Sequence, residues 1–380
     1  MSGRAPARRR SPGTPDLDRR IADAESRAIV MWRGEPVPLP ELRERIARMD
    51  DRRARERGYA AYAEALEALD PLYRERLAAW RAAGDVIALT ANGGTDPAAL
   101  AVDLERFGFH AETSYYAALR RYLALIDIEQ GDATEADLWH VERGSSWGQW
   151  FGQLETARAV AASGRGTTDA ATDTDGWRAA ESRLQGEAGP HDPTGVVGAA
   201  YATLVGAPEW LESELGMAVG DVAAFADFAA FVRLMRLRRV HAGLLYELRL
   251  FSIEDAALER AYYSGIIGHM TGVTVAEAGY LAGIPAPFAS VKGIESALLG
   301  AMLADSLEGR LGPRWWRDPE AATLTDRLST ASSTADVVAE LGYDGLDWRP
   351  VLRQIRTRLI GEMSGYGGPN ITTRAGTRKV

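Results

Sequence analysis

The sequence predicts an all-α fold. Segments rich in alanine, leucine, glutamate and arginine recur along the 380 residues, and no run shows the apolar–polar alternation that is typical of a strand. Prolines fall where helices would begin, as at Pro97 and Pro193, because the first turn of a helix needs no donor from them. Hydrophobic residues make up 46 % of the chain, which is enough for one large helical body or two lobes.

The first half of the chain is expected to form a helical lobe over residues 17–160. Residues 1–16 before it are rich in Pro, Gly and Arg, a composition typical of a disordered basic tail. Gly58 and Pro71 interrupt a strongly helical region, so we expect two or three helices there rather than one. The expected helices cover residues 17–32, 41–83, 98–107 and 113–130, and a capping box at 134–137 starts another.

A stretch without apolar periodicity divides the chain at residues 161–193. It is rich in Gly, Thr and Asp, which predicts a mobile linker between two lobes. The second helical lobe follows over residues 194–360, and a Gly-rich basic tail occupies residues 361–380. In this second lobe the expected helices cover 194–206, 208–215, 221–251, 254–268, 274–283, the stretch after Pro287, 319–327, 334–341 and 348–360.

Composition excludes several kinds of site and partner. The absence of cysteine rules out disulfides, thiolate zinc sites and thiol nucleophiles, and it fits a reducing cytoplasm. Residues 1–57 hold 15 arginines and 10 acidic residues, a balance of +5, so with a net charge of −9 the remainder carries −14. This acidic bulk argues against nucleic acid as the main partner. No apolar run approaches the roughly 18 residues needed to span a bilayer, so no membrane partner is expected.

The most informative stretch runs from residue 281 to 307 and contains the helix after Pro287. One face of this helix carries small residues that would let another helix approach closely; they are Ala289, Gly293, Ser296, Gly300 and Ala304. The next face places Lys292 and Glu295 one turn apart between bulky apolar residues. Lys292 and Lys379 are the only lysines among 44 basic residues, and burial can lower the pKa of a lysine enough for it to act as a base or nucleophile. The alternative is an ordinary ion pair along the helix.

Other candidate sites carry less information. No histidine lies within five residues of another, and nothing has the ligand spacing of a metal site, so no metal is expected. His241 shares a stripe with leucines, which indicates a core histidine. The expected helix at 221–251 also contains Arg233, Arg236, Arg238 and Arg239. These arginines are interpreted either as an anion clamp or as a ladder of structural ion pairs. Residues 143–151 are expected to form a loop whose two tryptophans line a ligand or pack on the body.

The order of features between residues 195 and 312 resembles the catalytic half of the thimet-oligopeptidase and oligoendopeptidase metallopeptidases. The resembling stretches are TGVVGAAYATLVGAPEWLESELG (194–216), LRRVHAGLLYELRLF (237–251), HMTGVTVAEAGYLAGIPAPFASVKGIESALLGAMLADSLEGRLG (269–312) and RWWRDPEA (314–321). GYAAYAEAL (58–66) and ATEADLWHVERG (133–144) fit the helical half of that family more loosely. The resemblance implies an all-helical, two-lobed body with a central substrate channel.

The chemistry of that family is missing from this chain. Its zinc-binding His-Glu-x-x-His helix has no counterpart, because the sequence contains no His-Glu dipeptide and the linker stands where that helix belongs. The third zinc ligand of the family, a glutamate, is replaced by glycine and valine. The tyrosines that stabilise the oxyanion in the family align with Phe288, Lys292 and Glu295. The resemblance therefore implies a degenerate member with neither zinc nor another cofactor.

The hypothesis from sequence is a zinc-less scaffold repurposed to bind or transform a small anionic or amine-bearing metabolite by elimination, ring closure or group transfer. Lys292 would act as acid, base or cation, with Glu295 as its partner. The substrate would be contacted by Arg236, Arg239, Tyr246 and Phe288. A protein partner is expected, because the chain would be one subunit of a hetero-oligomeric enzyme of specialised metabolism. The alternative is a non-enzymatic pseudopeptidase that stabilises a partner chain.

Overall fold

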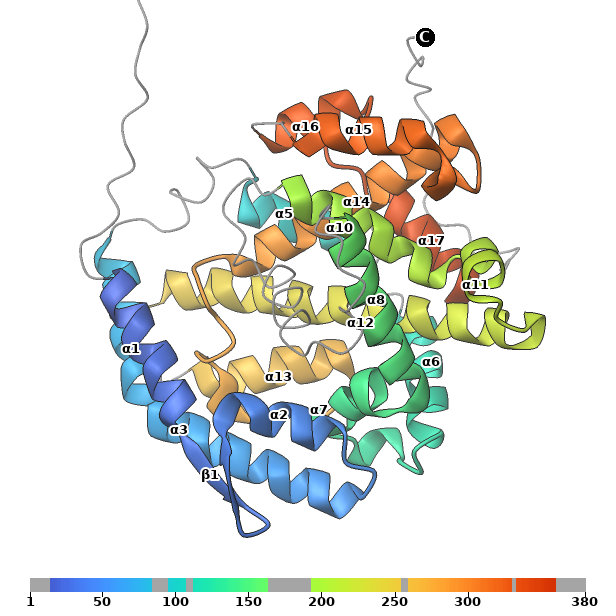
Figure 1. Cartoon of the computed structure of the whole chain (residues 1–380). Helices are drawn as coiled ribbons and strands as arrows, with labels where there is room; N and C mark the ends of the chain where they lie inside the picture. Colours follow the sequence, from blue (N-terminus) through green and yellow to red (C-terminus); the bar gives the residue numbers. More distant parts are fainter. Residues whose placement is uncertain are drawn as a thin grey trace, which may run out of the picture.

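The chain folds into a predominantly helical body (Figure 1). The computed structural model describes residues 14–83, 95–106, 112–162, 193–253, 259–329 and 333–359. Helices make up most of these residues, which confirms the all-α prediction. Within these ranges, β structure is limited to one two-stranded hairpin and an isolated bridge. None of the described helices is both long enough and apolar enough to cross a lipid bilayer.

The elements follow one another along the chain with short connections. The elements up to residue 162 are α1 (Thr14–Arg27), β1 (Ile29–Trp32), β2 (Glu35–Pro38), α2 (Leu39–Ala47), α3 (Arg52–Ala82), α5 (Pro97–Arg106), α6 (Glu112–Ala124), the 3-10 turn η1 (Gln130–Asp132), α7 (Glu135–Trp139), the π-helical turn η2 (His140–Gly144) and α8 (Ser146–Ala162). The later elements are α10 (Pro193–Ala202), η4 (Thr203–Gly206), α11 (Pro208–Leu215), α12 (Val219–Ser252), α13 (Arg260–Thr271), η6 (Glu277–Gly279), α14 (Ala289–Leu311), η7 (Trp315–Arg317), α15 (Pro319–Ser329), α16 (Thr334–Glu340) and α17 (Arg349–Leu359). Residues 163–192 of the predicted linker lie outside the described residues, as do 1–13 and 361–380 of the predicted tails.

Helix α12 occupies the middle of the body (Figure 1) and spans 34 residues. It touches α5, α6 and α8 from the first half of the chain and α11, α13, α14 and α17 from the second. Its buried residues lie on most sides of the helix rather than on one stripe. This pattern is typical of a helix that is enclosed by other helices.

One hydrophobic core connects the two predicted lobes. Aromatic residues of α6 and α8 pack on α12: the ring centroids of Tyr122 and Phe231 are 4.7 Å apart, and those of Trp147 and Phe228 are 5.9 Å apart. Leu298 of α14 joins the same core and is fully buried. Each half of the chain therefore completes its core with residues of the other half.

The hairpin β1–β2 corrects the predicted helix at 17–32, because the helix ends at Arg27 and a strand follows. The two strands are antiparallel, with Trp32 opposite Glu35. The turn residues Arg33 and Gly34 both have positive φ, 54° and 85°, as a type I′ turn requires. Arg-Gly is a weak turn signal beside Asn-Gly, and β2 contains prolines, which edge strands tolerate.

The region 41–83 forms two helices, α2 and α3, as predicted, but the break lies at residues 48–51 and not at Gly58 or Pro71, because α3 runs unbroken through both. Gly58 is a packing residue. A Cβ at this position would lie 2.7 Å from Cγ1 of Ile46 and 3.2 Å from the ring of Trp32, so glycine lets α2 and the hairpin close on α3. Pro71 removes one hydrogen bond from the helix, and packing of the flanking turns outweighs that loss.

Residues 143–151 form the end of the π-helical turn and the start of α8, not the predicted loop. Ser145 caps α8, since its Oγ accepts a hydrogen bond from the N–H of Gly148 at 3.0 Å. Gly144 permits a close approach rather than a loop, because a Cβ there would lie 1.9 Å from the carbonyl oxygen of Ala47. Trp147 belongs to the core, whereas Trp150 is 52 % exposed.

Helices α10 and α14 pack closely through small residues, as the stripe on α14 predicts. A Cβ at Gly300 would lie 2.5 Å from Cβ of Ala199 and 2.8 Å from its backbone carbonyl carbon. No side chain larger than hydrogen fits there without moving one helix. Gly198 of α10 differs, because nothing lies within 4 Å of the Cβ it would carry.

Gly300→Ala is expected to lower the free energy of unfolding by about 1–3 kcal/mol, because the added methyl group forces α10 and α14 apart. Gly198→Ala is the matched control, and its better helix propensity predicts a gain of up to about 1 kcal/mol. Urea denaturation of both variants measures the difference. Equal changes in the two variants would mean that the contact at Gly300 is not tight.

Candidate functional site

One face of α12 carries a line of polar contacts through the interior. Arg236, Arg239, Gly243 and Glu247 follow one another at intervals of three, four and four residues, so they lie on one side of the helix. Their partners come from residues 135–142 and from the first turn of α14. The charged residues at the start of this line are named the α12 cluster: Arg43, Glu44, Glu135, Glu142, Arg143, Arg236 and Arg239.

Arg236 holds the π-helical turn against α12. Its Nε donates to Oε1 of Glu142 at 2.7 Å, and its guanidinium lies 5.3 Å from the ring centroid of Phe151. Glu142 is in the turn η2, which closes through the N–H of Ser145 on the carbonyl of His140 at 2.7 Å. Turns of this type are frequent at functional sites, where the extra residue changes the direction of a side chain.

Glu142 is held as a carboxylate by the arginines around it. Burial alone would raise the pKa of Glu142, but the charges of Arg236, Arg143 and Arg43 outweigh burial and lower the pKa from 4.5 to about 2. Arg143 also forms an ion pair with Glu44 of α2. The π-helical turn is therefore bound through charged side chains to α2 on one side and to α12 on the other.

Arg239 forms the second ion pair of the line, with Glu135 at the start of α7. The other carboxyl oxygen of Glu135 accepts a hydrogen bond from the hydroxyl of Tyr59 at 2.8 Å. The same hydroxyl accepts a hydrogen bond from the N–H of Ala276 at 2.8 Å. The carboxylate of Glu135 therefore joins α7 to α12 and α3 directly, and the hydroxyl of Tyr59 links it to the backbone at residue 276.

Backbone pairing between residues 133–135 and Thr274 positions Glu135. The N–H of Thr274 donates to the carbonyl of Ala133 at 2.8 Å, and the N–H of Glu135 donates to the carbonyl of Thr274 at 2.9 Å. This pairing corrects the predicted helix at 274–283, which is helical only in the short turn η6. At the start of this segment, both backbone groups of Thr274 and the N–H of Ala276 are bonded to other segments instead of to a helix.

Three tyrosines near Glu135 stay neutral, of which Tyr263 is buried and Tyr59 and Tyr62 are partly buried. Burial raises the pKa of Tyr59, Tyr62 and Tyr263, and the negative charge of Glu135 raises each of them further. These hydroxyls are therefore hydrogen-bond donors and add no charge. Arg43 completes the surroundings, with its guanidinium 4.9 Å from the ring centroid of Trp139.

The α12 cluster contains four arginines and three glutamates, a net charge of +1 among its described residues. The two arginines of the cluster that belong to α12 are more exposed than their partners. The side chain of Arg239 is 37 % exposed against 7 % for Glu135, and that of Arg236 is 23 % exposed against 11 % for Glu142. The third pair has the reverse order, since Arg143 is 10 % exposed against 26 % for Glu44. On α12, the guanidinium groups are therefore the members of the pairs that meet solvent.

Glu247 is a buried carboxyl at the crossing of α12 and α14, and it is 2 % exposed. Its Oε1 accepts a hydrogen bond from Oγ of Ser290 at 2.7 Å. Gly243 leaves room for that hydroxyl, since a Cβ there would lie 2.9 Å from it. Burial raises the pKa of Glu247 from 4.5 to about 8, and the hydrogen bonds from Ser290 and from the N–H of Phe288 offset only part of the rise. Glu247 is therefore mostly neutral at pH 7.

Lys292 and Glu295 lie one turn apart on α14, and both are half-buried. Glu295 accepts a hydrogen bond from Oγ1 of Thr95. Lys292 is the one lysine within the described residues, and it lies two positions after Ser290. The contact between Ser290 and Glu247 therefore fixes the helical turn that carries this lysine.

Tyr246 and Phe288, two of the expected substrate contacts, belong to the hydrophobic core and are each 1 % exposed. Tyr246 packs on the ring of Tyr263 at 5.1 Å. Phe288 packs on Phe251 at 5.2 Å and has a φ of 54° at the start of α14. His241 is fully buried, as predicted for a core histidine.

Neither a metal site nor a relative identifies the cluster. No group of three or more histidine, aspartate or glutamate residues within the described ranges is arranged to hold a metal ion. Comparisons with protein-family models, with curated proteins and with solved structures found no match. The resemblance given above therefore depends on its sequence stretches alone.

Sequence reasoning found the arginines of the line and missed its carboxylates. Glu135 lies inside the predicted capping box, where an acidic residue is expected for local reasons. Glu142 belongs to a π-helical turn, which has no sequence pattern. Glu247 did leave a signal, because it interrupts the apolar run LLYELRLF of a helix predicted to be very apolar.

Glu247→Gln is expected to stabilise the protein increasingly as the pH rises. From pH 4.5 to about 8 the unfolded chain has lost the proton of Glu247 while the fold still holds it, so this residue lowers wild-type stability by about 1.4 kcal/mol per pH unit. The variant has no such loss. Its advantage in urea denaturation should be small near pH 5 and reach several kcal/mol by pH 8. An advantage of Glu247→Gln that does not change with pH would contradict a neutral carboxyl at this buried position. Glu214→Gln, at an exposed position, is the control.

Proposed function

We propose that this chain is a zinc-less helical scaffold that binds a small anionic metabolite beside α12 and transforms it. The observation that carries the proposal is the charge of the α12 cluster, where four arginines face three glutamates. A positive charge removed from bulk water attracts an anion more strongly than one at the surface. The resemblance to thimet oligopeptidases supports a two-lobed body whose central channel would admit such a ligand.

Arg236 and Arg239 of α12 suit recognition of a carboxylate or a phosphate. Each guanidinium is planar and has five N–H donors, a geometry that forms a fork for an anion. Glu135 and Glu142 hold both side chains in place beforehand, which reduces the conformational entropy lost on binding.

Lys292 would supply the chemistry, as base, acid or cation for a leaving anion, with Glu295 as its partner. Elimination, ring closure or group transfer would use such a pair without a metal. The half-buried position of Lys292 supports this role, because a partly desolvated lysine loses its proton more readily. The chain would work as one subunit of a hetero-oligomeric biosynthetic enzyme.

A second candidate is a non-enzymatic pseudopeptidase that stabilises a partner chain. One observation favours it: Arg236 and Arg239 each already have a glutamate partner, as members of a structural ladder would. In this case the excess positive charge would have no ligand, and Lys292 would be an ordinary lysine. The two candidates therefore differ in anion binding and in the titration of Lys292.

The expected result for the first candidate is saturable binding of succinate or inorganic phosphate, measured by calorimetry and by a rise in melting temperature. The double variant Arg239→Gln/Glu135→Gln removes both members of one ion pair, so that Glu135 is not left as a lone buried charge, and it should abolish binding. The control is Arg317→Gln/Glu214→Gln, which removes an ion pair with a largely exposed arginine and should leave binding unchanged. Failure of both anions to bind the wild type would favour the companion role.

Lys292 can be titrated directly, because the chain has only two lysines. Amine-selective acetylation followed by mass spectrometry gives the reactivity of each lysine as a function of pH. As a catalytic base, Lys292 should react with a midpoint well below that of the same lysine in the denatured chain, which is about 10.4. A midpoint equal to that of the denatured chain would remove Lys292 from the proposed chemistry while leaving anion binding untouched.

A further inference from the structure

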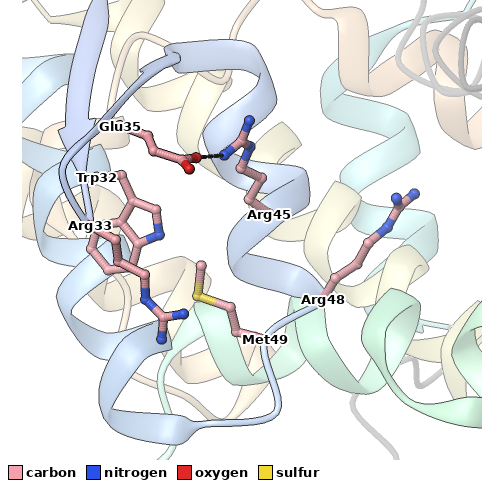
Figure 2. Close-up of a pocket in the computed structure, with 6 residues that line it drawn as sticks. All are labelled: Trp32, Arg33, Glu35, Arg45, Arg48 and Met49. Carbon is pink, nitrogen blue, oxygen red and sulfur yellow. Dashed lines mark hydrogen bonds and ion pairs between the residues drawn. The ribbon is translucent and has the colours of Figure 1, made fainter.

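A depression of about 420 Å³ lies between the tip of the β1–β2 hairpin and the last turn of α2 (Figure 2). It shares no lining residue with the α12 cluster. The hairpin contributes Trp32, Arg33 and Glu35, and α2 with the residues after it contributes Arg45, Arg48 and Met49. Its volume falls within the range of sites that bind small organic molecules.

Trp32 supplies a hydrogen-bond donor that has no acceptor. Its side chain is 8 % exposed, and its Nε1 has no hydrogen-bond partner among the described residues. In Figure 2 this nitrogen lies on the side of the indole that faces Met49. An indole N–H can only donate, and buried donors in folded proteins are nearly always paired. The missing acceptor is therefore the first feature that points to a ligand.

Arg33 supplies a second free donor at the same place. It forms no ion pair with any described residue, whereas Arg45 of α2 and Arg48 directly after α2 each pair with a glutamate. Its φ of 54° is a backbone conformation that favours glycine or asparagine over arginine. In Figure 2 its side chain extends past the indole toward Met49. The chain thus places an arginine where the turn alone would favour a smaller residue.

The other charged residues of the depression have local explanations. Arg45 pairs with Glu35 at 3.2 Å and with Glu41 at 2.8 Å, and Arg48 lies 3.7 Å from Glu44. Both arginines also belong to the C-terminal end of α2, where positive charge is favoured. The guanidinium of Arg48 points away from the indole (Figure 2). Among the residues that line the depression, Trp32 and Arg33 are therefore the two whose N–H donors have no acceptor in the described part of the chain.

We propose that this depression binds a small organic acid, a carboxylate attached to an apolar or aromatic body. The carboxylate accepts hydrogen bonds from the guanidinium of Arg33 and from the indole N–H of Trp32. The apolar body lies against the thioether of Met49 and the indole ring. Met49 is unbranched and adaptable, so it can move from the indole nitrogen when the acid enters.

Benzoate is a suitable probe, with benzyl alcohol as the neutral analogue and inorganic phosphate as the anion without an apolar body. Benzoate should bind the wild-type chain saturably, as followed by ligand-observed NMR, and it should still bind Arg239→Gln/Glu135→Gln, in which the proposed anion site beside α12 is removed. In that variant the other two compounds should bind at least about tenfold more weakly than benzoate. Equal binding of benzoate and benzyl alcohol to that variant would overturn the role of the carboxylate. Equal binding of benzoate and phosphate to that variant would overturn the role of the apolar body.

Arg33→Asn separates the ligand contact from the fold. Asparagine suits the first position of a type I′ turn, so the melting temperature should equal or exceed that of the wild type. The affinity for benzoate should fall about tenfold or more, and Trp32→Phe should also weaken binding. Arg310→Gln, an exposed arginine on α14, is the control and should bind as the wild type does. Unchanged affinity in Arg33→Asn, or no saturation in the wild type, would refute the site.

Discussion

The fold depends on the pairing of two buried carboxylates, Glu135 and Glu142, with arginines of α12. An ionised carboxylate in the interior costs several kcal/mol unless a partner compensates it. Glu135 begins the short helix α7, Glu142 lies in the π-helical turn η2, and their ion pairs bind these two elements to α12 at Arg239 and Arg236. The same pairing fixes the rotation of α12 about its axis, and this rotation directs Glu247 toward α14.

Helices and close helix contacts were predictable because their signals are local or periodic. The capping box at Thr134, the small residue at Gly300 and the core position of His241 all follow from spacing. The hairpin was not predictable, because a type I′ turn depends on backbone angles that Arg33 rarely adopts. Pro71 was wrongly predicted to interrupt a helix. Proline is a strong local signal for the end of a helix, but tertiary packing outweighs it here and α3 continues through this residue.

The arginines of the candidate site could be predicted from the sequence, but their glutamate partners could not. An arginine in an apolar helix is conspicuous in sequence, whereas its partner can come from any segment. Arg239 and Glu135 are brought together by long-range pairing between Thr274 and residues 133–135, which no spacing rule encodes. The two interpretations of these arginines, clamp and ladder, share one feature, because the ion pairs with Glu135 and Glu142 already orient the guanidinium groups.

The core that both halves share has a consequence for how the protein is made. Tyr122 and Trp147 reach their final surroundings only when Phe228 and Phe231 lie against them. During synthesis on the ribosome, the first half emerges before α12 exists, with these aromatic faces uncovered. The nascent chain must therefore remain protected from aggregation until the central helix has left the exit tunnel, and folding to the native core is a late event.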